Sequence, residues 1–257
     1  MFNNIQIPPV VKNLLIINAI FFGATLVLTS FNLPYRLGAF YFDSQFFKVW
    51  QPITYMFMHG SFMHILFNMF ALFTFGGVIE NRWGAKRFIN FYLITGLGAV
   101  ALQMGVQAYE VYQITGHVMN NPIFIDIAQN TVSINIPNIT EEQRQTLVGI
   151  YGFPMVGASG AIFGLLVAFG MLYPNSELYI MFIPVPVKAK FIIPIYIIFE
   201  LSLGVAQIPG DSVAHYAHLG GALLGFILVS VIAINYHNRG GNLFLTRQDF
   251  SLAGRYI

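Results

Sequence analysis

The sequence predicts an all-α polytopic membrane protein, a bundle of six transmembrane helices with a long extracytoplasmic loop between the third and fourth. Charged residues make up only 9% of the 257 residues, whereas soluble domains contain about a quarter. Apolar residues reach 56%, and 26 Phe with 13 Tyr give the aromatic content typical of lipid contact and membrane interfaces. Apolar runs long enough to cross a bilayer also recur along the chain.

Six apolar runs have the length that a membrane-spanning helix requires, about 20 residues. They lie at about 10–29, 52–79, 88–107, 156–172, 189–207 and 214–236. Nothing divides them into two clusters. We therefore expect residues 1–257 to form one integral-membrane domain with a polar tail at about 237–257.

The distribution of positive charge predicts the orientation. With a cytoplasmic N-terminus, nine of the 12 Lys and Arg residues fall on the cytoplasmic side, as the positive-inside rule requires. These nine are Lys12, Arg82, Lys86, Arg87, Lys188, Lys190, Arg239, Arg247 and Arg255, whereas Arg36, Lys48 and Arg144 fall outside. Both termini are then cytoplasmic. The short tail and the lack of a soluble domain favour a bacterial inner membrane.

The segment between the third and fourth runs, at about 108–153, is too polar to lie in lipid. It carries Glu110, Asp126, Glu141 and Glu142. Polar and apolar residues alternate over 130–137, which predicts a strand, and Thr140 precedes acidic residues as at a helix start. We expect a small folded lid or a mobile loop on the extracytoplasmic face.

Three polar residues interrupt the second apolar run. His59, His64 and Asn68 would cost free energy in a membrane unless they were paired, so each is a candidate functional residue. His64 and Asn68 are four residues apart and share one face of a helix, whereas His59 points elsewhere. His64 and Asn68 can therefore address one point together.

The fourth and sixth runs both begin with small residues around a reactive side chain. Ser159 lies in Gly157-Ala158-Ser159-Gly160, with Gly164 one turn later, and Gly221 and Gly225 follow His218. Each pattern alone is typical of a helix that packs closely on another helix. If these two small faces pack together, His218 comes near Ser159.

A serine, a histidine base and a helix with side-chain donors are the parts that acyl transfer needs. No acidic residue is expected beside His218, since Glu80 and Glu200 lie at or near the other ends of their helices and Asp211 precedes the sixth run. The sequence thus predicts a Ser159–His218 dyad without a third acidic member.

These motifs resemble the rhomboid family of intramembrane serine proteases. The family's nucleophile motif Gly-x-Ser-Gly matches Gly157 to Gly160, and its Ala-His before a glycine-rich helix matches Ala217-His218. Its His-x4-His-x3-Asn pattern matches His59, His64 and Asn68. The resemblance covers about 10–236, without the segment at 108–153 or the tail.

The resemblance implies a serine endopeptidase that cleaves transmembrane segments of membrane proteins in the lipid bilayer. His64, Asn68 and the Ser159 amide would form the oxyanion site, and Phe163 would stack on the catalytic imidazole. His59 and His215 would help to line a wet cavity that opens to the extracytoplasmic face.

Two further motifs bear on the family pattern. Glu80-Asn81-Arg82-Trp83-Gly84 follows its Glu-x-Arg-x-Gly motif, which we interpret as structural. Trp50-Gln51 stands where the family has Trp-Arg, so that a charge which anchors the first loop is absent.

Two alternatives from other functional classes remain. The pairs His59–His64 and His215–His218 look like the histidine boxes of a membrane iron enzyme, but six histidines are too few for a two-metal cluster, and we expect no metal or cofactor. A catalytically silent relative that binds membrane clients would typically lack Ser159 or His218. The net charge of +2 is too small to indicate a nucleic-acid partner.

Overall fold

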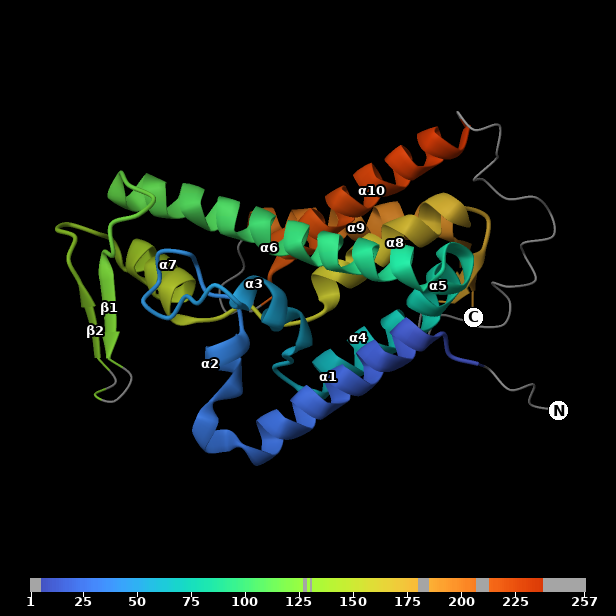
Figure 1. The fold of residues 1–257 in the computed structure, drawn as a ribbon. Helices are drawn as coiled ribbons and strands as arrows, with labels where there is room; N and C mark the ends of the chain where they lie inside the picture. The colour runs from blue at the N-terminus through green and yellow to red at the C-terminus, as the bar shows by residue number, and fades with distance from the viewer. Residues whose placement is uncertain (1–5, 127–128, 130, 180–184, 207–212, 238–257) are drawn as a thin grey trace.

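The computed structural model describes residues 6–126, 129, 131–179, 185–206 and 213–237, and the described chain is mostly helical (Figure 1). Five helical segments are long and apolar enough to cross a membrane, namely Pro9–Val27, Phe62–Trp83, Ala85–Thr115, Ala189–Ala206 and His215–Ile234. The fourth predicted run forms a shorter apolar helix, α8 (Ser159–Leu172), of 14 residues. The predicted fold class, a polytopic helical membrane protein, is confirmed.

In chain order, the first group of elements runs up to the end of α6 and the second group follows it. The first group contains α1 (Pro9–Val27), η1 (Thr29–Phe31), α2 (Leu33–Leu37), α3 (Gln51–Thr54), η2 (Tyr55–Phe57), α4 (Phe62–Ala71), the π turn η3 (Leu72–Gly76), α5 (Gly77–Trp83) and α6 (Ala85–Thr115). The second contains β1 (Ile123–Asp126), β2 (Thr131–Ile134), α7 (Glu141–Gly152), α8, β3 (Glu177–Tyr179), β4 (Pro186–Lys188), α9 (Ala189–Ala206) and α10 (His215–His237).

The start of α1 is held by a side chain from another helix. Its N-cap residue Pro8 offers no side-chain acceptor, so the first N–H groups need a partner from elsewhere. The buried carboxylate of Glu80 in α5 accepts hydrogen bonds from the N–H groups of Val10, at 2.9 Å, and Val11, at 2.7 Å. These contacts agree with a structural role for the Glu80–Gly84 motif.

The second predicted run is not one continuous helix. Residues 52–57 form the end of α3 and the turn η2, and α4 begins only after Ser61, whose hydroxyl accepts the N–H of His64. The chain continues through η3 into α5. His59 therefore lies before the helix that carries His64 and Asn68, so helical spacing does not relate it to them.

The described part of the segment predicted at 108–153 is folded. α6 extends eight residues beyond the predicted end of the third run, and β1 pairs antiparallel with β2, with Ile123 opposite Ile134. Thr140 forms a capping box with Gln143 at the start of α7. A small core formed by Tyr41, Val111, Ile123, Leu147, Ile150 and Tyr151 joins these elements to the first loop.

Asp43 in the first loop ties this folded segment to the bundle. Its carboxylate accepts the N–H groups of Asn120 and Asn121, at 3.0 and 2.9 Å, and the hydroxyl of Tyr151, at 2.9 Å. Burial and, after it, the hydrogen bond to Asp43 raise the pKa of Tyr151. The phenol therefore stays protonated and donates to Asp43.

The neutral side chain of Gln51 anchors the first loop. Gln51 is fully buried, and its carbonyl oxygen accepts the N–H groups of Phe40, at 3.4 Å, and Lys48, at 3.0 Å. Its amide nitrogen donates to the carbonyl oxygen of Phe46 at 3.0 Å. An uncharged amide thus makes the backbone contacts that hold this loop.

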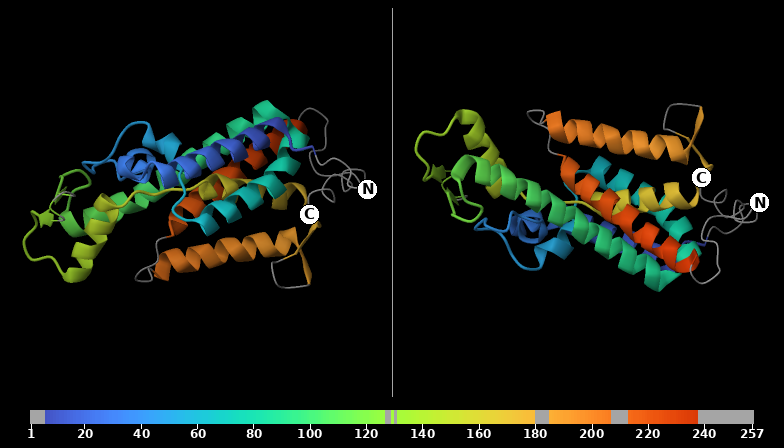
Figure 2. Two further views of the ribbon diagram at one scale, coloured as in Figure 1. Left: turned by 90° about the horizontal axis from the view of Figure 1, so that it is seen from below. Right: turned by 90° about the horizontal axis from the view of Figure 1, so that it is seen from above.

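The centre of the bundle is formed by α6, α8 and α10, while α9 runs along one outer edge beside α8 and α10 (Figure 2). Glycines allow the central helices to approach closely. A Cβ on Gly221 would overlap the carbonyl oxygen of Gly160, and one on Gly225 would lie 2.8 Å from the Cα of Gly164. The predicted packing of the two small faces is confirmed.

Some residues used in the sequence predictions lie outside the described part of the chain. They are Asn130 at the start of the predicted strand, Gln207 at the predicted end of the fifth run, Asp211, and the tail from residue 238 onward with Arg239, Arg247 and Arg255.

Candidate active site

Ser159 is placed by the backbone that precedes it. Met155 forms an isolated bridge with Ala39, and the N–H of Gly157 donates to the carbonyl oxygen of Tyr55 at 2.9 Å. Gly157 adopts φ +129°, a conformation that L side chains rarely adopt. Ser159 is then the first residue of α8, where backbone N–H groups have no partner within the helix.

His218 lies against Ser159. The distance from His218 Nε2 to Ser159 Oγ is 2.8 Å, and the close packing of α8 on α10 allows this approach. The ring of Phe163 stacks on the imidazole, with ring centroids 4.4 Å apart and planes 7° apart. The stack that the resemblance implies is therefore present.

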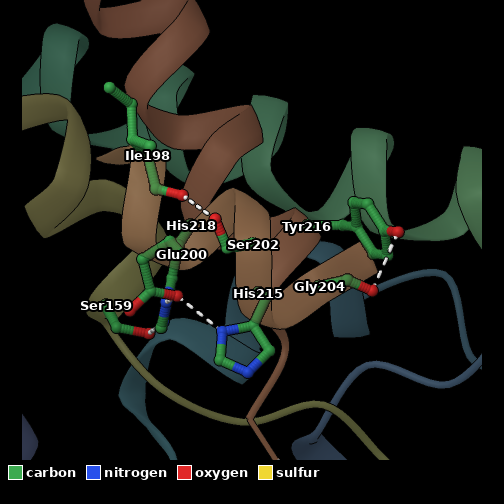
Figure 3. Close-up of polar contacts among 8 residues, drawn as sticks. All are labelled: Ser159, Ile198, Glu200, Ser202, Gly204, His215, Tyr216 and His218. Atoms are coloured by element: carbon green, nitrogen blue, oxygen red, sulfur yellow. Dashed lines mark hydrogen bonds and ion pairs between the residues drawn. The ribbon is translucent and has the colours of Figure 1, made fainter. Parts of the chain in front are cut away.

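The expectation that no acidic residue lies beside His218 is wrong. Glu200 in α9 is buried, and its Oε2 lies 2.8 Å from His218 Nδ1. The same oxygen lies 2.7 Å from Nδ1 of His215, which precedes His218 by one turn. Figure 3 shows the carboxylate between the two imidazoles, with Ser159 near the far side of His218.

The geometry of antiparallel helices explains this correction. α9 ends at Ala206 and α10 begins at His215, so both helices approach the same end of the bundle. Glu200 lies six residues before the end of α9 and His218 three residues after the start of α10. At 1.5 Å per residue, these depths differ by about 5 Å, which a glutamate side chain can span. Counting depth from the shared loop would have found Glu200.

Glu200, His215 and His218 are also the one group within the described chain that could hold a metal ion. Tetrahedral coordination with bonds of about 2.0–2.1 Å separates ligand atoms by about 3.3 Å. The distances of 2.7 and 2.8 Å are shorter and are those of hydrogen bonds. In the part of the chain that the structure describes, His59 and His64 belong to no such group.

His64 borders the backbone that leads to Ser159. A Cβ on Gly157 would lie 2.7 Å from His64 Nε2 and 3.5 Å from Ser159 Oγ, so glycine is needed here for space as well as for conformation. Asn68 is buried, and its side-chain N–H₂ has no hydrogen-bond partner among the described residues. His59 is buried with its ring edge-on to His64, at 5.0 Å between centroids.

Comparison with known proteins identifies the family. Residues 47–235 match the family model described as the Rhomboid domain. The chain belongs to the rhomboid family. The rhomboid match includes Ser159, His218, His64, Asn68 and Glu200, and it extends across the segment that forms β1, β2 and α7.

Several rhomboid proteins are similar to this chain. RHOMBOID-like protein 4 of Arabidopsis thaliana is 29% identical over 73% of this chain and 35% of its own length. Rhomboid protein 1, mitochondrial, of Saccharomyces cerevisiae is 29% identical over 66% of this chain and 38% of its own length. Rhomboid protease AarA of Providencia stuartii is 27% identical over 77% of this chain and 61% of its own length. The chain thus spans less than two thirds of each of these rhomboid relatives.

Proposed function

We propose that this rhomboid-family protein is an intramembrane serine endopeptidase with Ser159 as nucleophile and His218 as general base. The observation that carries the proposal is the distance of 2.8 Å between Ser159 Oγ and His218 Nε2 in a bundle of membrane helices. A serine hydroxyl is a weak nucleophile until a base accepts its proton. The contact supplies that base at hydrogen-bond distance.

The reaction would proceed through an acyl-enzyme. His218 Nε2 takes the proton of Ser159 Oγ as the oxygen attacks the scissile carbonyl, and the imidazolium then gives this proton to the leaving amine. The C–N bond breaks and leaves an ester on Ser159. Water, deprotonated by His218, hydrolyses the ester and restores the free hydroxyl. Phe163 keeps the imidazole plane fixed through these steps because it stacks on the ring.

The Ser159 amide, His64 and Asn68 would bind the oxyanion. Preorganised donors at the developing negative charge make a large contribution to catalysis. The position of Ser159 at the start of α8 and the approach of His64 Nε2 to Gly157 support this assignment. So does the side-chain N–H₂ of Asn68, which has no hydrogen-bond partner among the residues that the structure describes. His59 supports the His64 ring by edge-on contact.

The substrate would be a transmembrane segment of another membrane protein. Ser159 and His218 lie at or near the starts of α8 and α10, at the end of the bundle near α7 and the first loop (Figure 1). With cytoplasmic termini, as the positive charges favour, this end faces outward. Cleavage would release a fragment on the extracytoplasmic side, in a bacterial inner membrane.

The test uses the purified protein in liposomes with a model transmembrane substrate. Ser159→Ala and His218→Ala should abolish cleavage, whereas Asn68→Ala should keep part of it because other oxyanion donors remain. Ser230→Ala is the matched control, since the hydroxyl of Ser230 donates to the carbonyl oxygen of Phe226 in its own helix. Cleavage by Ser159→Ala at the wild-type rate would show that the assignment is wrong.

Covalent labelling by a serine-directed phosphonate separates an enzyme from a silent relative that only binds membrane clients. The wild type should be labelled at Ser159, and Ser159→Ala should not. An unlabelled, well-folded wild type that cleaves none of a varied substrate panel would favour the client-binding alternative.

A further inference from the structure

We propose that Glu200 is a positioning residue that fixes the tautomer of His218, so that the site works as a Ser159–His218–Glu200 triad. This inference rests on the function proposed above. Its observation is the contact between Glu200 Oε2 and His218 Nδ1 at 2.8 Å, on the ring edge opposite Ser159.

The two contacts of the imidazole define where its proton lies. An ionised carboxylate only accepts hydrogen bonds, so the contact with Glu200 places the proton of neutral His218 on Nδ1. Nε2 then presents its lone pair to the Ser159 hydroxyl at 2.8 Å. This is the tautomer that a general base needs. The opposite tautomer would direct an N–H group at the hydroxyl and leave Ser159 with no proton acceptor.

His215 holds the carboxylate in place. Its Nδ1 lies 2.7 Å from the same oxygen of Glu200, and His215 and His218 lie on one face of α10 because they are three residues apart. A buried carboxylate is costly unless donors satisfy it. Two imidazole N–H groups give Glu200 these donors and restrict the angle from which Oε2 approaches His218.

Aromatic packing connects Glu200 to the same imidazole. Tyr196 lies one turn before Glu200 on α9, and its ring packs on Phe163 with centroids 5.1 Å apart. Phe163 in turn stacks on His218. Two chains of contacts, one polar and one aromatic, therefore lead from a single face of α9 to the imidazole.

The first experiment compares Glu200→Gln with Ser202→Ala in the liposome cleavage assay. An amide can turn its NH₂ toward Nδ1 and so favour the wrong tautomer; kcat should fall at least about 100-fold, with KM changed less than about threefold. Glu200→Asp should recover part of kcat. Ser202 lies on the same helix, but its hydroxyl bonds to the carbonyl of Ile198 (Figure 3), so Ser202→Ala should cleave like the wild type.

The outcomes separate this inference from the proposed function. Wild-type cleavage by Ser159→Ala would overturn both. An inactive Ser159→Ala with a Glu200→Gln variant whose kcat stays within about threefold of wild type would overturn the triad alone. A loss of kcat that tracks a loss of folded protein in Glu200→Gln, with no recovery in Glu200→Asp, would show a purely structural role.

A second measurement needs no variant of Glu200. In the wild type labelled with ¹⁵N-histidine, the signals that disappear in His218→Ala belong to His218. We expect the neutral ring to carry its proton on Nδ1, and a proton on Nε2 would overturn the proposal. Elemental analysis of the wild type should find no stoichiometric metal; a bound metal that Glu200→Gln loses would assign Glu200, His215 and His218 to a metal site instead.

Discussion

The contact between α8 and α10 offers a direct test of how the candidate site is aligned. Gly221 lies three residues after His218, and a methyl group there would overlap the carbonyl oxygen of Gly160, the residue that follows Ser159. Replacement of Gly221 by alanine therefore forces the two helices apart where they carry the base and the nucleophile.

The neighbouring glycine pair indicates the size of this displacement. A Cβ on Gly225 would lie 2.8 Å from Gly164 Cα, about 1 Å short of ordinary carbon–carbon contact. A similar shift would lengthen the 2.8 Å contact between Ser159 and His218 to about 3.8 Å, beyond hydrogen-bond distance. Misplacement by about 1 Å can lower activity by about 100-fold, and overpacking costs about 1–3 kcal/mol of stability.

The assay measures kcat/KM in liposomes together with thermal unfolding in detergent. Gly221→Ala should lose about 100-fold in kcat/KM, and Gly225→Ala, one turn further from His218, should lose less at a similar cost in stability. Gly23→Ala is the control, since nothing lies within 4 Å of a Cβ there. A Gly221→Ala variant with wild-type kcat/KM would refute the argument that this glycine contact aligns the site.

Three further predictions concern other contacts. Glu80→Ala should destabilise the protein by about 2–5 kcal/mol, measured by unfolding, because two N–H groups at the start of α1 lose a charged acceptor. Glu80→Gln should destabilise it less. Equal stability of the wild type and both variants would contradict the role of Glu80 in holding the start of α1. Asp43→Ala should increase proteolysis of residues 116–140 without unfolding the bundle, since three hydrogen-bond donors lose their acceptor. An unchanged digestion pattern would show that Asp43 does not anchor this segment to the bundle. Phe163→Leu should lower kcat by about tenfold while KM stays unchanged, because it removes the stack on the imidazole; an unchanged kcat would exclude this role.

The helical membrane fold and the approach of Ser159 to His218 could be predicted because small residues leave a pattern in the sequence. Gly160 and Gly164 face Gly221 and Gly225 across the helix contact, and the four-residue spacing identifies each face without knowledge of the other. Helix starts with local caps were equally accessible, as Thr140 shows at α7.

The break in the second apolar run could not be predicted from hydropathy. The chain turns at 58–61 and starts again after Ser61, although apolar residues lie on both sides of this turn. Hydropathy measures transfer into lipid and does not register where backbone hydrogen bonds are interrupted. Ser61, a good N-cap residue three positions before His64, was the available signal.

Glu200 shows what a membrane sequence reveals when depth is counted from the correct loop. Polar residues inside membrane helices are costly, and this argument singled out His64 and Asn68. A charged carboxylate costs more than these polar groups. The position of Glu200 within an otherwise apolar stretch of α9 therefore implied hydrogen-bond donors on another helix at the same depth in the membrane. The next helix along the chain starts from the end of the bundle that α9 approaches, and its first turn carries His215 and His218 close to that depth. An acidic residue within a membrane helix therefore predicts its partner when both depths are measured from the loop that the two helices share.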